Sequence, residues 1–341
     1  MTKVMQVIAG AEHGGAEAFF MRLVPALHRA GIDQHAAIRG HRARGDTLSA
    51  AGIPVAELRF GGAFDLVTGP SLRATVRAFD PDILIAWMSR AARFAPTGRH
   101  VLAGRLGGYY DLKYYRRCDH LIGNTEDICA WLKREGWPAD RTWYLPNFVD
   151  DILLPPADRA TLETPSDAPL LLGLGRLHPN KGFDVALAAL ARLPRAWLWL
   201  AGEGPERAAL TALAGRLGVA DRVRFLGWRD DVPALLAAAD VFICPSRHEP
   251  LGNVVIEAWA RSTPVVAAAS QGPSQLIEPG VSGLLVPIDD ADALAAAAAD
   301  LLDDPARAAE LGQGGHDAWR RDFTEASVVA RYLDFFDRVA R

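Results

Sequence analysis

Short apolar runs of strand length alternate with amphipathic helical stretches along the chain. The helical pattern is clear in the first such stretch, where Phe20, Leu23 and Leu27 share one helix face. This alternation is typical of a parallel β-sheet covered by helices. The predicted strands lie within residues 3–10, 34–40, 54–60, 82–88, 99–105, 120–125, 169–177, 196–204, 222–228, 240–246, 263–269 and 282–287.

The pattern runs twice, which predicts an α/β protein with two Rossmann-like, doubly wound domains. Prolines and polar residues crowd into residues 145–169, which mark the junction. A chain of 341 residues also exceeds the roughly 250–300 at which a single core usually stops growing. We place the domains at residues 1–150 and 151–324. Residues 325–341 predict a helix with no strand after it, which we expect to return to the first domain.

Composition and the chain ends predict a soluble, cytoplasmic protein. Hydrophobic residues make up 50% of the chain, yet no apolar run reaches the roughly 20 residues of a membrane helix. The first ten residues are too short for a signal peptide and have the length of a strand. Cys118, Cys129 and Cys244 form no CxxC pair or Cys/His cluster, so we predict buried free thiols rather than disulfides or a zinc site.

Charge is distributed unevenly between the two halves. The first 150 residues carry 19 Lys and Arg against 15 Asp and Glu, whereas the remainder carries 18 against 26. A basic first half favours an anionic partner, although ordinary variation in surface composition explains the same counts. Nucleic acid is not expected as a partner, because no nucleic-acid fingerprint is present and the isoelectric point is about 6.1.

In open α/β sheets, ligands bind beyond the carboxyl ends of the strands, so we expect a site in the cleft between the two domains. The first strand is followed by Gly14 and Gly15 and then by a helix. Paired glycines at such a turn let a ligand approach the backbone, and the amides of a helix start attract anions. The steric needs of the turn alone are the alternative explanation.

A second strand-end loop carries two cations. Arg176 and Lys181 precede a helix that begins near Phe183 or Asp184. Two positive charges beside the positive end of a helix are unfavourable unless an anion such as a diphosphate lies between them. An NAD fingerprint is disfavoured, because His178 stands where its third glycine belongs. Two solvated surface cations are the alternative.

Two carboxylates mark a third loop, RHEPLGNVVIEAWA at residues 247–260. A helix that begins near Asn253 leaves Glu249 in the loop and places Glu257 one turn inside, on the same face as Asn253. The helix start attracts a phosphate, but the two acids would repel it. The conflict disappears if the acids instead accept hydrogen bonds from hydroxyl groups of the same ligand. Glu257 lies roughly 6 Å along the axis from the first amides, an offset that suits a ribose. The alternative is a dipole-stabilising carboxylate and an ordinary helical glutamate.

The motifs GRLHPNKG and RHEPLGNVVIEAWA resemble the second-domain motifs of the retaining glycosyltransferase family 4, which has the GT-B fold of two Rossmann-like domains facing a cleft. Glu249 and Glu257 match the E-x7-E signature of that family. GGAE, LPNFVD, GEGP, FLGWRDDV and GVSGLLVP extend the resemblance over nearly the whole chain. The chain looks most like enzymes that add sugars to bacterial cell-surface glycolipids such as the lipopolysaccharide core.

The resemblance implies transfer of a sugar from a nucleotide diphosphate sugar, either a UDP- or a GDP-sugar, to a hydroxyl with retention of configuration and without a cofactor. Arg176 and Lys181 would neutralise the leaving diphosphate, and Glu249 would orient the sugar. Glu257 would bind the ribose. The other donor-binding positions are Gly252, Asn253 and Val254 at the distal phosphate, Gly227, Trp228 and Arg229 at the base, and Gly14 and Gly15 over the diphosphate.

The chain departs from the family in one respect. Relatives often have a donor-contacting histidine in a first-domain loop, but the corresponding stretch here, VLAGRLGGYYDLKYYRR, contains no histidine. We predict that Arg105, Tyr109 or Tyr110 takes the place of this histidine on the acceptor side. No spare carboxylate stands out as a nucleophile, so we favour attack by the acceptor on the face of the departing diphosphate. The D-x-D sequence from Asp80 to Asp82 precedes a strand instead of following one, so no metal site is predicted.

The acceptor side is the least constrained by the sequence. Phe19 and Arg22 lie away from the apolar face of the first helix, and KYYRR at residues 113–117 adds three charges and two tyrosines. We predict that this basic, aromatic surface contacts an anionic glycolipid at the inner membrane face, as a peripheral association. Two other functions stay open: a nucleotide-sugar epimerase of related fold, and a non-catalytic two-domain sugar-binding protein.

Overall fold

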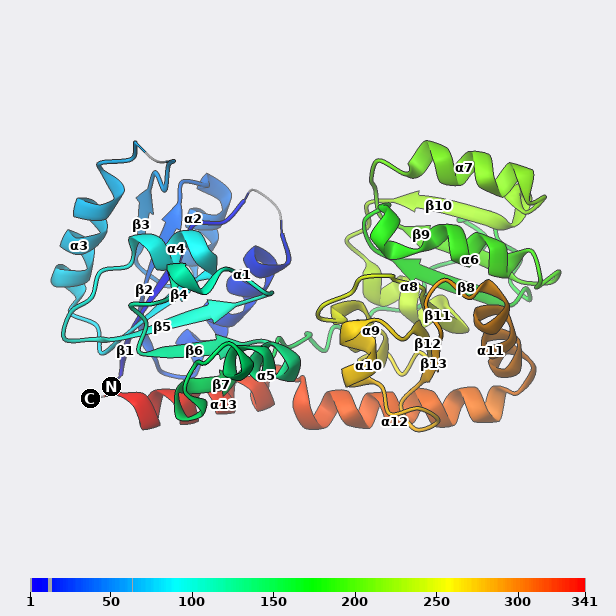
Figure 1. The fold of residues 1–341 in the computed structure, drawn as a ribbon. Helices are drawn as coiled ribbons and strands as arrows, with labels where there is room; N and C mark the ends of the chain where they lie inside the picture. The colour runs from blue at the N-terminus through cyan, green and yellow to red at the C-terminus, as the bar shows by residue number, and fades with distance from the viewer. Residues whose placement is uncertain (1, 12–13, 63, 341) are drawn as a thin grey trace. The chain divides into compact units, whose positions relative to one another are not determined.

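The computed structural model describes residues 2–11, 14–62 and 64–340. The chain divides into two compact units, one formed by Met1–Phe148 with Glu325–Arg341 and the other by Val149–Thr324. Each unit is built around one sheet in which every pairing between the named strands is parallel (Figure 1). The predicted fold class is therefore confirmed.

The first unit has a seven-stranded sheet in the order β3-β2-β1-β4-β5-β6-β7. Its strands are β1 (Lys3–Ile8), β2 (Asp33–Arg39), β3 (Val55–Leu58), β4 (Ile83–Trp87), β5 (Val101–Leu106), β6 (His120–Gly123) and β7 (Thr142–Tyr144). Its helices are α1 (Gly15–Arg29), α2 (Arg42–Ala50), α3 (Thr68–Phe79), α4 (Met88–Phe94), α5 (Glu126–Arg134) and α13 (Glu325–Val339).

Both faces of this sheet are buried. Val4 and Ile8 of β1 belong to a core shared with α1 and α13, whereas Met5 and Val7 belong to a second core shared with α3, α4 and α5. Successive strand residues point to opposite faces, so a strand covered on both sides must be apolar along its length. This burial explains why the strands of the chain read as nearly continuous apolar runs.

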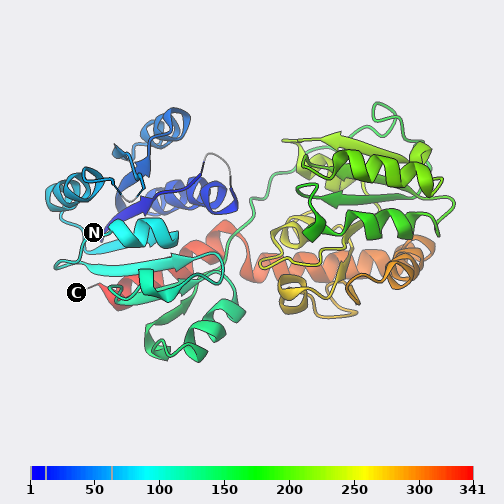
Figure 2. The same cartoon turned by 45° about the horizontal axis from the view of Figure 1, so that its top comes forward.

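The last helix returns to the first unit, as the sequence predicts. Phe335 of α13 packs against Trp143 of β7 with ring centres 4.9 Å apart, and Glu325 forms a 2.6 Å ion pair with Arg29 of α1. Figures 1 and 2 both show α13 lying alongside the first sheet. Its buried residues recur at helical spacing and form one face: Val328, Val329, Tyr332, Phe335, Phe336 and Val339.

The second unit has a six-stranded sheet in the order β10-β9-β8-β11-β12-β13. Its strands are β8 (Leu170–Leu174), β9 (Trp197–Ala201), β10 (Val223–Gly227), β11 (Val241–Cys244), β12 (Val265–Ala268) and β13 (Leu284–Val286). Its helices are α6 (Phe183–Leu190), α7 (Arg207–Arg216), α8 (Val232–Ala238), α9 (Asn253–Trp259), α10 (Gln271–Leu276), α11 (Ala291–Asp303) and α12 (Pro305–Asp322).

The strand order of each sheet reverses at one point. In the first unit β1 lies between β2 and β4, and in the second unit β8 lies between β9 and β11. The loops that follow such neighbouring strands diverge to opposite faces and leave a crevice for ligands at the carboxyl edge. The loops after β8 and β11 are therefore the place to look for a site in the second unit.

All twelve predicted strands are present. The sequence misses β7, because its three residues are only partly buried and form no apolar run. The three cysteines are free and buried as predicted, and burial raises the pKa of Cys118 to about 12 and that of Cys129 and Cys244 to about 11. Within the described ranges, no helix is both long and apolar enough to cross a membrane.

Candidate active site

The loops after β8 and β11 meet around an ion pair between Lys181 and Glu249. Glu249 is only 8% exposed, and its second carboxylate oxygen accepts a 3.4 Å hydrogen bond from the amide of Gly252. Gly175 follows β8 with φ of +140°, and a side chain there would lie 3.2 Å from Cε of Lys181. A glycine at this position leaves the room that the lysine needs to reach the glutamate.

Backbone hydrogen bonds tie three segments of this site together. The amides of Arg247 and His248 donate to the carbonyl of Asn180, at 2.8 and 3.2 Å. The amide of Gly272, in α10, donates to the carbonyl of Glu249 at 2.7 Å. The position of Glu249 is thus fixed from both sides before any ligand binds.

The Arg247 side chain reinforces this frame. Its guanidinium makes two hydrogen bonds to Asp184, at 2.9 and 2.6 Å, one to Asp289 at 2.5 Å and one to the carbonyl of Pro179 at 2.7 Å. Hydrogen bonds to Asp184 raise the pKa of Arg247. Burial would raise the pKa of Asp184, but the bonds and charge of Arg247 outweigh burial and lower it. The sequence gives no signal for this role, since the two acids lie 63 and 42 residues away.

Glycines allow close backbone approach at the same loops. Gly182 has φ of +65°, and a Cβ there would lie 2.1 Å from the carbonyl oxygen of Pro245. Gly252 precedes α9 with φ of +73°. A Cβ on Gly272 would lie 2.7 Å from the carbonyl oxygen of Glu249. Gly182 and Gly272 were not among the predicted site residues, although each joins two of the loops.

The remaining donor-side residues fall at the predicted elements. Helix α6 begins at Phe183 and α9 at Asn253, as the sequence predicts. Val254 and Glu257 are half-buried on α9. Arg176 is exposed, and no residue of the described ranges makes a hydrogen bond or ion pair with its guanidinium. The structure therefore brings Lys181, Glu249 and Gly252 into contact, whereas Arg176 makes no hydrogen bond or ion pair with these three residues.

The predicted base-binding residues follow β10. Gly227 has φ of +70°, and its carbonyl accepts a 2.7 Å hydrogen bond from Gly202. Trp228 is 76% exposed. Arg229 makes two hydrogen bonds to Asp231, at 2.7 and 2.6 Å, and these bonds raise its pKa. The indole of Trp228 thus presents an open surface, whereas the charge of Arg229 is already compensated.

In the first unit, a buried carboxylate fills the turn after β1. Glu17 accepts a 2.8 Å hydrogen bond from the amide of Ala11. A Cβ on Gly10 or Gly14 would lie 2.0 or 2.3 Å from the carboxylate oxygens of Glu17. Gly15, which begins α1, has open space around its Cβ position. An anion is therefore repelled on the side of Gly14, and the open side of the turn is that of Gly15.

Arg105 does not reach the surface, in contrast to the predicted acceptor-side role. It is 2% exposed and donates to the hydroxyl of Tyr332 at 2.8 Å and to the side-chain oxygen of Asn147 at 2.7 Å. The guanidinium also lies 4.4 Å from the ring centre of Trp87 and 4.8 Å from that of Phe19. These contacts join β5 to α13 and to the end of the first unit, so Arg105 is an internal anchor in this structure.

The two tyrosines after β5 differ in exposure. Tyr109 is 41% exposed, and its hydroxyl donates to Asp127; partial burial together with this bond raises the pKa of Tyr109 to about 12. Tyr110 is half-buried, and burial together with the charge of Glu17 raises its pKa. Of the three predicted replacements for the family histidine, Tyr110 is therefore the one placed beside the glycine turn.

The predicted exposure of Phe19 beside Arg22 is wrong. Phe19 is fully buried and packs against Phe148, with ring centres 5.3 Å apart. In the stretch at residues 113–117, Tyr115 is also fully buried. Among the described residues of the first unit, the most exposed large apolar side chains instead follow β3: Phe64 and Leu66, at 96% and 84%.

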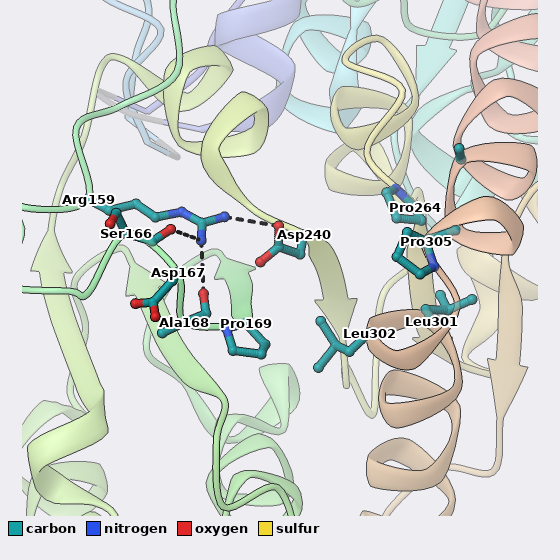
Figure 3. Close-up of a pocket in the computed structure, with 12 residues that line it drawn as sticks. Arg159, Ser166, Asp167, Ala168, Pro169, Asp240, Pro264, Leu301, Leu302 and Pro305 are labelled. Atoms are coloured by element: carbon teal, nitrogen blue, oxygen red, sulfur yellow. Dashed lines mark hydrogen bonds and ion pairs between the residues drawn. The ribbon is translucent and has the colours of Figure 1, made fainter.

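A pocket of about 470 Å³ lies at the opposite edge of the second sheet, among residues that precede β8, β11 and β12 (Figure 3). Arg159 lines it, but its guanidinium is already satisfied by the carbonyls of Ser166, Ala168 and Ala238 and by a 3.0 Å bond to Asp240. This arginine holds the segment before β8 against the sheet. The pocket therefore belongs to the amino ends of the strands and is separate from the Lys181–Glu249 loops.

Within the described part of the chain, no group of three or more His, Cys, Asp or Glu is placed to hold a metal ion. The two acids of the D-x-D sequence have structural roles. Asp82 accepts a 2.8 Å hydrogen bond from the amide of Lys3, and Asp80 ends α3 in the left-handed conformation.

Known proteins are similar to this chain in both sequence and fold. Residues 156–317 match the family model "Glycosyl transferases group 1", and residues 13–152 match "Glycosyltransferase Family 4". The chain is 39% identical to the lipopolysaccharide core biosynthesis glycosyltransferase LpsD of Rhizobium meliloti over 98% of both chains. This chain belongs to the same glycosyltransferase family as LpsD. It is also 39% identical to LpsE of the same organism, over 94% of this chain and 95% of LpsE.

The fold of this glycosyltransferase is that of the GT-B enzymes. The crystal structure of Anabaena HepE in complex with UDP superposes with a TM-score of 0.85 over 99% of this chain and 100% of HepE, at 22% identity. Family membership decides between the functions that the sequence leaves open. It favours glycosyl transfer over an epimerase or a non-catalytic sugar-binding protein.

Proposed function

We propose that this glycosyltransferase moves a sugar from a nucleotide diphosphate sugar to a hydroxyl of a glycan or glycolipid, in synthesis of the lipopolysaccharide core or another cell-surface polysaccharide. The names of LpsD and LpsE support the pathway, and the UDP complex of HepE supports a nucleotide donor. A GDP-sugar stays within the proposal, because a Mycolicibacterium smegmatis relative at 34% identity, covering 69% of this chain and 71% of its own, is named as GDP-mannose-dependent.

The observation that carries the proposal is the Lys181–Glu249 pair beside the start of α9. The two side chains are 21% and 11% exposed, so their charges attract each other more strongly than charges in bulk water. A diphosphate that approaches Lys181 competes with Glu249 for the ammonium group. The carboxylate then gains capacity to accept hydrogen bonds from sugar hydroxyls. A ligand with both a diphosphate and a sugar satisfies both partners.

Positive charge on the donor side accelerates the reaction in this proposal. Negative charge grows on the diphosphate as the glycosidic bond breaks, so Arg176 and Lys181 bind the transition state more tightly than the ground state. They supply the charge stabilisation that a divalent cation gives in metal-dependent enzymes. The backbone around Gly252, Asn253 and Val254 holds the distal phosphate, and Glu257 binds the ribose.

Retention of configuration is part of the proposal. A double displacement needs a spare carboxylate near the sugar, but Glu249 is already assigned to hold the hydroxyls of that sugar. We therefore favour attack by the acceptor hydroxyl on the face from which the diphosphate leaves. The departing phosphate takes the proton of that hydroxyl, so the new glycosidic bond forms as the old one breaks.

Kinetics of Lys181→Ala test this assignment. We expect kcat with a UDP- or GDP-sugar to fall by about 10²–10³-fold, because the lysine acts mainly in the transition state. Lys133→Ala, which removes an exposed lysine from α5, is the matched control and should keep the parental kcat. A Lys181→Ala enzyme with parental kcat and only a raised donor KM would contradict the role.

We also propose that the first unit associates with the inner membrane face as a peripheral protein. Phe64, Leu66 and Val67 are exposed in the loop before α3, close in sequence to the exposed Arg59. Asp65 turns inward and accepts hydrogen bonds from the amides at both ends of this loop, which directs its neighbours outward.

Apolar side chains beside cations favour an anionic lipid surface. Sedimentation with phosphatidylglycerol vesicles should decrease for Phe64→Ser/Leu66→Ser. Equal sedimentation of parent and variant, or equal binding to neutral and anionic vesicles at low salt, argues against membrane contact.

A further inference from the structure

Cationic side chains gather beyond the carboxyl ends of β1, β2 and β3 in the first unit. Two hollows of about 420 and 380 Å³ lie there and share Arg39 and Gly40 as lining residues. Arg44 also lines the first hollow, and Arg59 lines the second. We call these two hollows together the Arg39 pocket.

The register of the sheet fixes the cations of this pocket. Arg39 is the last residue of β2 and pairs with Leu58, the last residue of β3, so Arg59 follows directly beside it. Arg44 lies in the first turn of α2, is buried, and donates a 3.2 Å hydrogen bond to the carbonyl of Ala11 after β1. Three consecutive strand ends of the sheet therefore bring three arginines to one concave surface.

The two exposed arginines of the pocket, Arg39 and Arg59, carry the charges that are open to a ligand. No residue of the described ranges forms a hydrogen bond or an ion pair with the guanidinium of Arg39 or of Arg59, and both are exposed. Glu57 also lines the pocket, and its carboxylate lies between Gly45 and Gly40, where a Cβ would be 2.6 and 3.5 Å from its two oxygens. Glu57 forms no ion pair with either arginine. Like charges that line a concave surface focus a positive potential over it.

The chemistry of arginine indicates what such a pocket binds. A guanidinium presents a planar fork of N–H donors that matches two oxygens of a phosphate or a carboxylate. The second hollow, which Arg39 and Arg59 both line, has a volume of about 380 Å³, which is enough for one such oxyanion. The donor diphosphate already has its cations, Arg176 and Lys181, in the second unit. A cationic pocket in the first unit therefore calls for a second anion.

We propose that the Arg39 pocket binds a phosphate or carboxylate group of the acceptor, which makes the acceptor an anionic glycan or glycolipid. This inference rests on the proposed transfer reaction and names the class of its acceptor. Arg39 and Arg59 contact the oxyanion directly. Arg44 adds positive charge from beneath and holds the loop after β1 against the pocket.

Binding of glucose 6-phosphate to the whole chain tests the proposal. Calorimetry is performed with UDP at saturation, so that the donor-side cations are occupied. We expect the parent protein to bind glucose 6-phosphate but not glucose, and Arg39→Gln/Arg59→Gln to bind it at least tenfold more weakly. Arg99→Gln, which neutralises another exposed arginine of the first unit, is the control and keeps the parental affinity. Equal affinity of parent and double variant, or no binding by the parent, overturns the proposal.

Two further measurements separate the sources of the anion and the two proposals. If the double variant no longer binds phosphatidylglycerol vesicles but still binds glucose 6-phosphate with parental affinity, the pocket serves a lipid headgroup and the inference is wrong. If the double variant instead binds UDP more weakly than the parent, the arginines are part of the donor site. That result overturns the inference but does not contradict the proposed transfer reaction. Failure of the parent to bind any nucleoside diphosphate contradicts the donor proposal, while the glucose 6-phosphate comparison still decides the pocket.

Discussion

The loops after β8 and β11 and those after β1, β2 and β3 both lie at the carboxyl edge of a parallel sheet, but they treat charge differently. In the second unit, Lys181 contacts Glu249, and Arg247 contacts two aspartates. In the first unit, Arg39 and Arg59 contact no carboxylate of the described residues. The charged residues of the second-unit loops are paired with one another, whereas Arg39 and Arg59 in the first-unit loops are exposed and unpaired among the described residues.

This difference has consequences for selectivity. Open arginines bind any accessible oxyanion, since nothing must be displaced. A paired lysine releases its glutamate only to a ligand that replaces the lost attraction, because an unpaired buried carboxylate is costly. A diphosphate alone satisfies Lys181 but leaves Glu249 unpaired, whereas an attached sugar supplies hydroxyl donors to the glutamate. In the proposed reaction, the paired loops would thus favour the intact donor, and the open pocket would tolerate acceptors of varied structure.

The largest difference between the two regions is expected from glycine substitutions. Gly182→Ala places a Cβ 2.1 Å from a carbonyl oxygen at φ of +65°, which should lower the free energy of unfolding by about 2–5 kcal/mol. Gly40→Ala is the counterpart in the Arg39 pocket, where the Cβ meets only Glu57 at 3.5 Å, and should change stability by less than about 0.5 kcal/mol. Urea unfolding measures both. Similar losses would mean that the two sets of loops are equally constrained.

A smaller effect is expected where the second unit leaves a side chain open. Trp228→Ala should weaken UDP binding by about 1–3 kcal/mol if the exposed indole stacks on the base. Arg229→Gln tests the paired neighbour at the predicted base site: because Asp231 already compensates its charge, UDP affinity should change less than about twofold. Isothermal titration with UDP gives both values. A larger loss of UDP affinity for Arg229→Gln than for Trp228→Ala would show that the ion pair with Asp231 does not keep Arg229 from binding UDP.

The sequence predicts backbone-level features of the site better than its side-chain contacts. The starts of α6 and α9 follow from periodicity and glycine placement. Burial of Phe19 could not be predicted from its own helix, because α13 belongs to the same core and arrives from the end of the chain. The Arg39 pocket is equally hidden, since Arg39 and Arg59 become neighbours only through the parallel register of β2 and β3.

The smallest effect is expected at the half-exposed pair of Asp184 and Arg247. Asp184→Asn should cost about 1 kcal/mol at neutral pH, because Arg247 keeps its bonds to Asp289 and Pro179. The folded-state pKa of Asp184 is lowered, so its stabilisation is present above the ordinary aspartate pKa and is lost as pH falls through the lowered value. The stability gap between parent and variant should therefore close below about pH 4. Arg59→Gln, which removes an uncompensated charge, should cost nothing at any of these pH values; a comparable loss would show that its charge is paired after all.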